Sequence, residues 1–132
     1  MHQPLHSTTR VTATDLDGDD GGNGVKLTSP ANLHTFWDGV LGGGESPSTA
    51  LNAIVVLQEA PESAVNDLNV SDWIKESFDA AKQTSYKSPP IGAGTGPFTL
   101  TLAYRTAARS LAEKRIALAG ARLAKMLNEE LK

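Results

Sequence analysis

The 132-residue chain contains no cysteine, few aromatic residues (5%) and no long apolar run. Without cysteine, disulfide frameworks, cysteine-ligated zinc or iron–sulfur sites and thiol nucleophiles are excluded. The longest unbroken aliphatic stretch, Ala53 to Leu57, is far too short to span a bilayer, so no membrane partner is expected. The first residues, MHQPLH, contain neither a basic nor an apolar segment, so the chain as written shows no signal peptide.

The net charge of −3 is unevenly distributed along the chain. Residues 1–100 hold 5 Lys and Arg against 12 Asp and Glu, whereas residues 101–132 hold 7 against 3. A basic stripe is one sign of nucleic-acid binding, but an excess of this size on one helix is more typical of a solvated face. The excess of acidic residues in the loops of residues 1–100 favours a cation as a partner over an anion.

The length predicts a single domain, and the periodicity predicts a mainly α fold. Residues 7–31 form a long irregular N-terminal loop region, and the Pro/Gly-rich residues 87–97 form a structural connection. Helices are expected from Leu33 to the glycine run at 42–44, from 46 to 57, from Ser71 to about 81, and from about 100 to 131. Within residues 46–57, the β-branched run Ile54-Val55-Val56 could instead form a strand. The expected packing face of the last helix consists of Ile116, Ala119, Gly120, Leu123 and Leu127.

All three histidines lie within the first 34 residues. His34 and Asp38 are four residues apart on an expected helix and therefore share one face, where they can chelate an ion or simply form a surface hydrogen bond. Two zinc sites are compatible with these residues. A closed site of His2, His6, His34 and Asp38 would be structural, whereas three of these ligands with one open position would be catalytic. Nitrogen and carboxylate ligands without sulfur suit zinc best.

The acidic loop at residues 15–20 invites comparison with an EF-hand calcium loop. The glycine required at position six is Asp20, and the glutamate required at position twelve is Lys26, so this interpretation fails. A solvated acidic turn accounts for the aspartates, but it does not account for the Gly21-Gly22-Asn23 sequence that follows.

Three motifs in order carry a family resemblance: His2-Gln-Pro-Leu-His6, Gly18-Asp19-x-Gly21-Gly22-Asn23 and Asn32-Leu33-His34-x-Phe36-Trp37-Asp38. Together they resemble the zinc-dependent single-strand-specific nucleases of the S-one/P-one type. Two later motifs agree: Asp72-Trp73-x-x-Glu76-Ser77 and Ala119-Gly120-x-Arg122-Leu123. The resemblance covers essentially the whole chain but only about the second half of the family's domain. It implies a partial multi-helix domain of the phospholipase C / zinc nuclease type.

The resemblance implies three zinc ions in a cleft, one of which His6, His34 and Asp38 would hold. His2 would then have a supporting or structural role. Asn23 would contact the base of a bound nucleotide. Its alternative role is that of a turn residue that tolerates positive φ.

The family's other two zinc ions take their ligands from the N-terminal half of the domain. A bridging aspartate six residues before the position of His6 would fall just before Met1. We therefore expect residues 1–132 to be the C-terminal part of a zinc-dependent nuclease domain, beginning at an internal methionine, with the N-terminal half absent. The full-length parent would be secreted or periplasmic.

The implied activity is hydrolysis of phosphodiester bonds in single-stranded DNA or RNA to 5′-nucleotides. The zinc pair would supply hydroxide, and the third zinc would bind phosphate oxygen and stabilise charge on the departing oxygen. With the third site alone, the isolated chain is expected to be inactive or feebly active. Two alternatives are a zinc-dependent phospholipase C-type phosphodiesterase and a non-catalytic metal-binding helical remnant.

Overall fold

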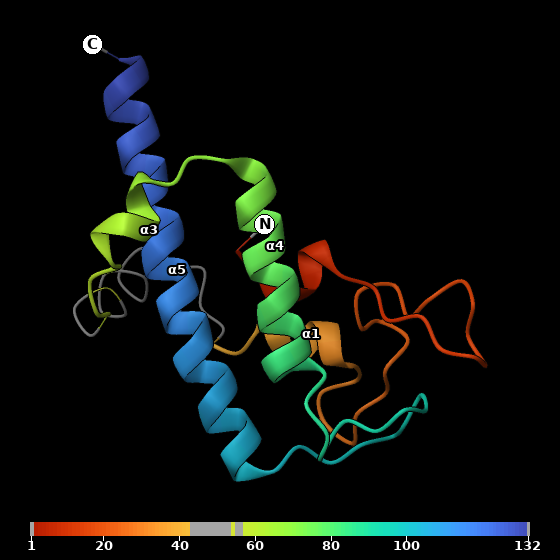
Figure 1. The fold of residues 1–132 in the computed structure, drawn as a ribbon. Helices are drawn as coiled ribbons and strands as arrows, with labels where there is room; N and C mark the ends of the chain where they lie inside the picture. Colours follow the sequence, from red (N-terminus) through yellow and green to blue (C-terminus); the bar gives the residue numbers. More distant parts are fainter. Residues whose placement is uncertain (1, 43–53, 55–56, 132) are drawn as a thin grey trace.

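The computed structural model describes residues 2–42, 54 and 57–131, and Figure 1 shows a mostly helical arrangement. The chain forms the 3₁₀ turn η1 (Pro4–Ser7), α1 (Leu33–Asp38), α3 (Glu62–Asn66), α4 (Val70–Ala80), its π-helical continuation η2 (Ala81–Ser85), and α5 (Leu102–Glu130). The described residues form isolated β-bridges, such as that between Leu27 and Phe98, but no strand. The expected mainly α fold is confirmed.

The helices begin at residues whose side chains cap them. Asn32 accepts a hydrogen bond from the Thr35 amide at 2.8 Å and starts α1 at Leu33, as the sequence predicts. Asn69 caps α4 and Thr101 caps α5 in the same way, so both helices begin within two residues of the expected positions. However, α1 ends at Asp38, with Gly39 as its C-cap, before it reaches the glycine run. The short helix α3 was not predicted, and most of the helix predicted over 46–57 lies outside the described residues.

The core lies where α1 meets η2 and the first half of α5. Trp37 is 2% exposed, and its Nε1 donates to the Tyr104 hydroxyl at 3.2 Å. That hydroxyl in turn donates to the Ser85 carbonyl at 2.7 Å. Burial raises the pKa of Tyr104, which keeps the phenol protonated and able to donate. This chain of hydrogen bonds joins three elements across the core.

The predicted packing face of α5 is wrong. Ile116, Leu123 and Leu127 are 49%, 58% and 49% exposed. The side that packs includes two arginines seven residues apart, Arg115 and Arg122, together with Tyr104, Ala108 and Leu118. Periodicity alone could not identify this side, because an arginine is buried only where a partner neutralises it. On α4, similarly, Trp73 and Ser77 are buried while Ile74 and Phe78 are exposed.

The acidic loop is also organised differently from the solvated turn that was expected. Asp19 is 5% exposed, and its Oδ1 accepts hydrogen bonds from the Arg10 amide, the Gly22 amide and the Tyr86 hydroxyl. Its Oδ2 lies 3.5 Å from Arg10 Nε. Asp19 therefore ties the N-terminal loop to Tyr86, just beyond η2, and shapes the loop that carries Gly21 and Asn23.

Candidate metal centre

The structure brings together three of the residues singled out in the sequence. His6 lies on η1, and His34 and Asp38 lie on α1. His6 Nε2 is 3.4 Å from Asp38 Oδ1, and His34 Nε2 is 3.4 Å from Asp38 Oδ2. One potential ligand atom from each residue lies within 4.8 Å of the other two. We call these three residues the His–His–Asp group.

Two of the separations in the His–His–Asp group are close to those between ligands of a zinc ion. Ligands about 2.0–2.1 Å from a tetrahedral zinc stand about 3.3 Å apart, close to the two nitrogen–oxygen separations observed. The two imidazole rings stack with centroids 5.2 Å apart and planes inclined by 22°. His6 and Asp38 are about half exposed, so the group opens to solvent on one side. Substrate or water could therefore reach an ion held here.

A backbone contact fixes the tautomer of His34. Its Nδ1 lies 2.9 Å from the Gly21 carbonyl oxygen, which can only accept a hydrogen bond. Nδ1 therefore carries the proton, and the lone pair is on Nε2, the atom that faces Asp38. Metal-ligating histidines commonly have this kind of carbonyl partner on the second nitrogen. Gly21 has φ of +61°, and a Cβ there would lie 2.8 Å from the Leu5 carbonyl oxygen, so glycine is required.

His2 does not join the group, which rules out the four-ligand closed site. Its Nε2 accepts a hydrogen bond from Arg122 Nη1 at 3.1 Å, and its ring lies 5.5 Å from the ring of Trp73. Burial, with the charges of Arg115 and Arg122, lowers the pKa of His2 to about 4. His2 therefore stays neutral at physiological pH and has a structural role.

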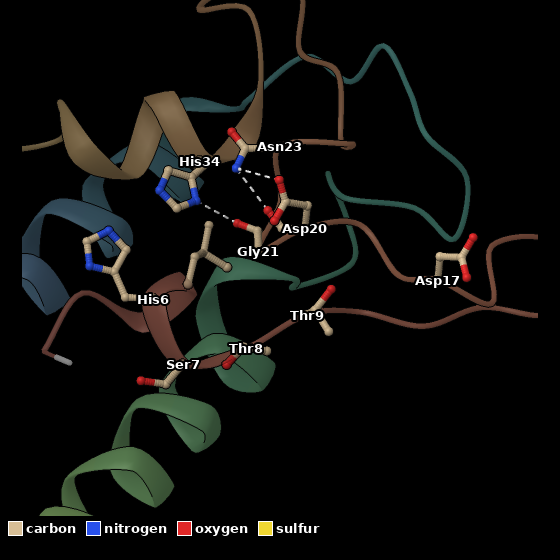
Figure 2. A pocket seen from close by; sticks show the side chains of 10 residues that line it. His6, Ser7, Thr8, Thr9, Asp17, Asp20, Gly21, Asn23 and His34 are labelled. Carbon is tan, nitrogen blue, oxygen red and sulfur yellow. Dashed lines mark hydrogen bonds between the residues drawn. The ribbon is translucent and has the colours of Figure 1, made fainter.

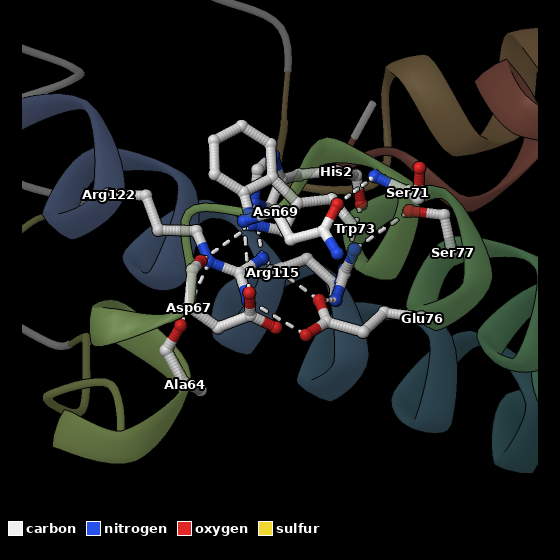
Figure 3. Close-up of polar contacts among 10 residues, drawn as sticks. All are labelled: His2, Ala64, Asp67, Asn69, Ser71, Trp73, Glu76, Ser77, Arg115 and Arg122. Carbon is white, nitrogen blue, oxygen red and sulfur yellow. Dashed lines mark hydrogen bonds and ion pairs between the residues drawn. The ribbon is translucent and has the colours of Figure 1, made fainter. Parts of the chain in front are cut away.

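His2 belongs to a partly buried network that Figure 3 shows between α4 and α5. The Glu76 carboxylate accepts hydrogen bonds from Arg115 Nη1 at 2.8 Å and from Arg122 Nη1 and Nη2 at 2.9 and 2.8 Å. Arg115 Nη2 also donates to Ser77 Oγ at 2.7 Å. We call His2, Glu76, Ser77, Arg115 and Arg122 the arginine–glutamate network. Glu76, Ser77 and Arg122 lie in the later motifs quoted above, but their pairing was not deduced from the sequence.

A pocket of about 670 Å³ adjoins His6 and His34 of the His–His–Asp group, and Figure 2 shows these two side chains with the others that line it. Besides the apolar Leu5, it is lined by His6, His34, Gly21 and Asn23, with Asp17, Asp20 and three hydroxyl side chains of residues 7–9. Asn23 Nδ2 donates to the Asp20 carbonyl oxygen at 2.9 Å. Among the described residues other than glycine, only Asp20 has positive φ, at 50°. The positive-φ explanation for Asn23 is therefore wrong.

The fold and this site define a mainly helical protein with a histidine–carboxylate group beside a polar pocket. The profile of the family described as S1/P1 Nuclease matches residues 1–132, so the chain belongs to that family. Comparisons with curated proteins and with solved structures gave no match. S1/P1 nucleases are in general zinc-dependent, secreted hydrolases. Within the described residues, no helix has the length and apolar character needed to cross a membrane.

Proposed function

We propose that His6, His34 and Asp38 hold one zinc ion in a domain that hydrolyses phosphodiester bonds of single-stranded DNA or RNA to 5′-nucleotides. The observation that carries this proposal is the convergence of three ligand atoms within 4.8 Å, from two elements far apart in the sequence. The family match supports the nuclease chemistry and gives no support to the phospholipase C-type alternative. The full-length parent would be secreted or periplasmic, as family members generally are.

The adjacent pocket is the proposed nucleotide site. Its volume of about 670 Å³ is within the range typical of small-molecule pockets. None of the described residues that line it is a lysine or an arginine, and Asp17 and Asp20 would repel a phosphate. A bound zinc would supply the missing positive charge and polarise a phosphoryl oxygen. The acidic character of the pocket therefore supports a metal at its edge.

Asn23 is the proposed contact to the nucleotide base. Its amide nitrogen is engaged by the Asp20 carbonyl oxygen, which orients the side chain. The side-chain carbonyl oxygen is then left to accept a hydrogen bond from an N–H group of the base. A single unstacked nucleotide offers such groups freely, in agreement with a preference for single strands.

A second surface supports the proposal that another part of the domain completes the site. A largely apolar groove of about 300 Å³ has Val40, Leu41 and Ile116 in its lining, together with His6 and Asp38. Further along α5, Leu123 and Leu127 are also exposed. A segment seated in the groove would reach the His–His–Asp group and could add further metal ligands. In this proposal residues 1–132 are the C-terminal part of the nuclease domain, and the isolated chain cleaves nucleic acid feebly or not at all.

The zinc content of the purified chain tests the proposal. We expect one tightly bound zinc per chain and its loss in His34→Ala. His2→Gln is the matched control, because it alters a histidine outside the group, and we expect it to keep its zinc. A helical chain without zinc would contradict the proposed centre.

Cleavage assays test the activity. Rapid, chelator-sensitive cleavage of single-stranded DNA by the isolated chain would contradict the view that the site is incomplete. Zinc binding without turnover, even when the N-terminal half is supplied, would favour the non-catalytic remnant.

A further inference from the structure

Gln3 lies beside the His–His–Asp group and contacts two parts of it. Its Nε2 donates a hydrogen bond to Asp38 Oδ1 at 3.0 Å, across 35 positions of sequence. Its Oε1 accepts a hydrogen bond from the Leu5 amide and so caps η1, the turn that carries His6. One side chain thus joins the His6 turn to the carboxylate at the end of α1.

The backbone on both sides of Gln3 is fixed. The carbonyl oxygen of His2 accepts a hydrogen bond at 3.1 Å from Nε of Arg115, which the arginine–glutamate network holds in place. The Gln3 carbonyl oxygen accepts from the His6 amide at 3.1 Å, and Pro4 and Leu5, which follow Gln3, are buried. The backbone that carries the Gln3 carboxamide is therefore already fixed, so little conformational entropy is lost when the carboxamide contacts Asp38.

Asp38 needs such support. It is the last residue of α1, its side chain is 52% exposed, and a carboxylate at a helix C-terminus faces the negative end of the helix dipole. With Oδ1 held by Gln3, the carboxylate stands with one oxygen 3.4 Å from each histidine Nε2.

We infer that Gln3 is a positioning residue for the metal centre. It holds the carboxylate of Asp38 in the position that faces the two imidazoles. This inference rests on the metal site proposed above. Hydrogen-bond partners of metal ligands typically change metal affinity by about 10–100-fold, and we expect an effect of that size from Gln3.

Two substitutions separate the bridge to Asp38 from the cap on η1. Gln3→Ser keeps a side-chain oxygen that can cap the turn but is too short to reach Asp38, whereas Gln3→Ala loses both contacts. Gln83→Ser, at an exposed glutamine on η2, is the matched control. Zinc affinity is measured by competition with a chromophoric chelator, and helicity and thermal unfolding are measured on the metal-free proteins.

We expect Gln3→Ser and Gln3→Ala to weaken zinc binding alike, by about 10-fold or more, with only Gln3→Ala lowering the melting temperature. Gln83→Ser should match wild type in both measurements. Wild-type affinity in Gln3→Ser, with a loss in Gln3→Ala alone, would overturn the inference, because Gln3 would then act only as a cap. Failure of the wild-type chain to bind zinc would overturn the metal centre itself, which is a different outcome.

Discussion

Two groups in this chain combine histidine with a carboxylate, and they differ in what neutralises the charge. In the arginine–glutamate network, two guanidinium groups surround Glu76, and the pKa of Glu76 falls to about 2, chiefly through its hydrogen bonds to Arg122. In the His–His–Asp group, the carboxylate of Asp38 faces two imidazoles and one amide. The first group contains its own cations, and its two arginines and Ser77 are buried. The second consists of residue types that can bind a cation and is open to solvent, as expected of a binding site.

The largest expected effect comes from Glu76→Gln. This change leaves Arg122, which is 1% exposed, and Arg115, which is 8% exposed, without their counter-charge. Breaking a buried ion pair in this way typically costs about 3–5 kcal/mol. Urea unfolding should show a loss of that order, or the chain should fail to fold. A loss below about 1 kcal/mol would show that the network contributes little to the stability of the fold.

The corresponding change in the His–His–Asp group is Asp38→Asn. It should affect zinc affinity strongly and stability little. The free energy of unfolding of the metal-free chain should change by less than about 0.5 kcal/mol, because Asp38 is exposed and opposes the helix dipole. Zinc affinity should fall by at least about 100-fold, more than an outer hydrogen-bond partner contributes. Unaltered zinc affinity, measured by chelator competition, would remove Asp38 from the ligand set.

Acidification should weaken the network in two stages. The pKa of His2 is lowered from 6.5 to about 4, so the unfolded chain binds more protons than the folded chain between these values. Stability should therefore fall as the pH decreases from about 6.5 to about 4. Glu76, with its pKa lowered from 4.5 to about 2, should add a further loss between those values. Urea midpoints measured across this range should show both stages, and His2→Gln should remove only the first.

The smallest expected effect is that of Asn23→Ala on nucleotide binding. Loss of one hydrogen bond to the base should weaken the binding of a 5′-mononucleotide to the zinc-loaded chain by about 5-fold, or about 1 kcal/mol. Zinc binding should not change, because Asn23 contacts Asp20 rather than the three ligands. Calorimetric titration measures both quantities on one sample. A change in zinc affinity would indicate that Asn23 shapes the loop instead.

The parts of this structure that depend on local sequence were predicted best. The cap at Asn32 and the four-residue spacing of His34 and Asp38 placed two candidate metal ligands on one helical turn. His6 and His2 were both candidates from the sequence, and the family resemblance selected His6, since no local pattern joins either to α1.

The parts that depend on distant partners were missed. Arg115 and Arg122 can be buried because Glu76, 39 and 46 positions away in the sequence, neutralises them. Their burial turns the apolar face predicted for α5 away from the packed side. Asp19 is buried for the same kind of reason, since its partners include Arg10 and Tyr86. Helix α3 has only five residues and no side-chain cap, so its sequence marked its start weakly.

The most direct test of the central claim is a crystal structure of the zinc-loaded chain with diffraction data collected at the zinc absorption edge. We predict one strong anomalous peak among His6 Nε2, His34 Nε2 and the Asp38 carboxylate, with His2 still bound to Arg122. A peak located elsewhere, or none in a crystal grown with zinc, would contradict the assignment of this group as the metal centre.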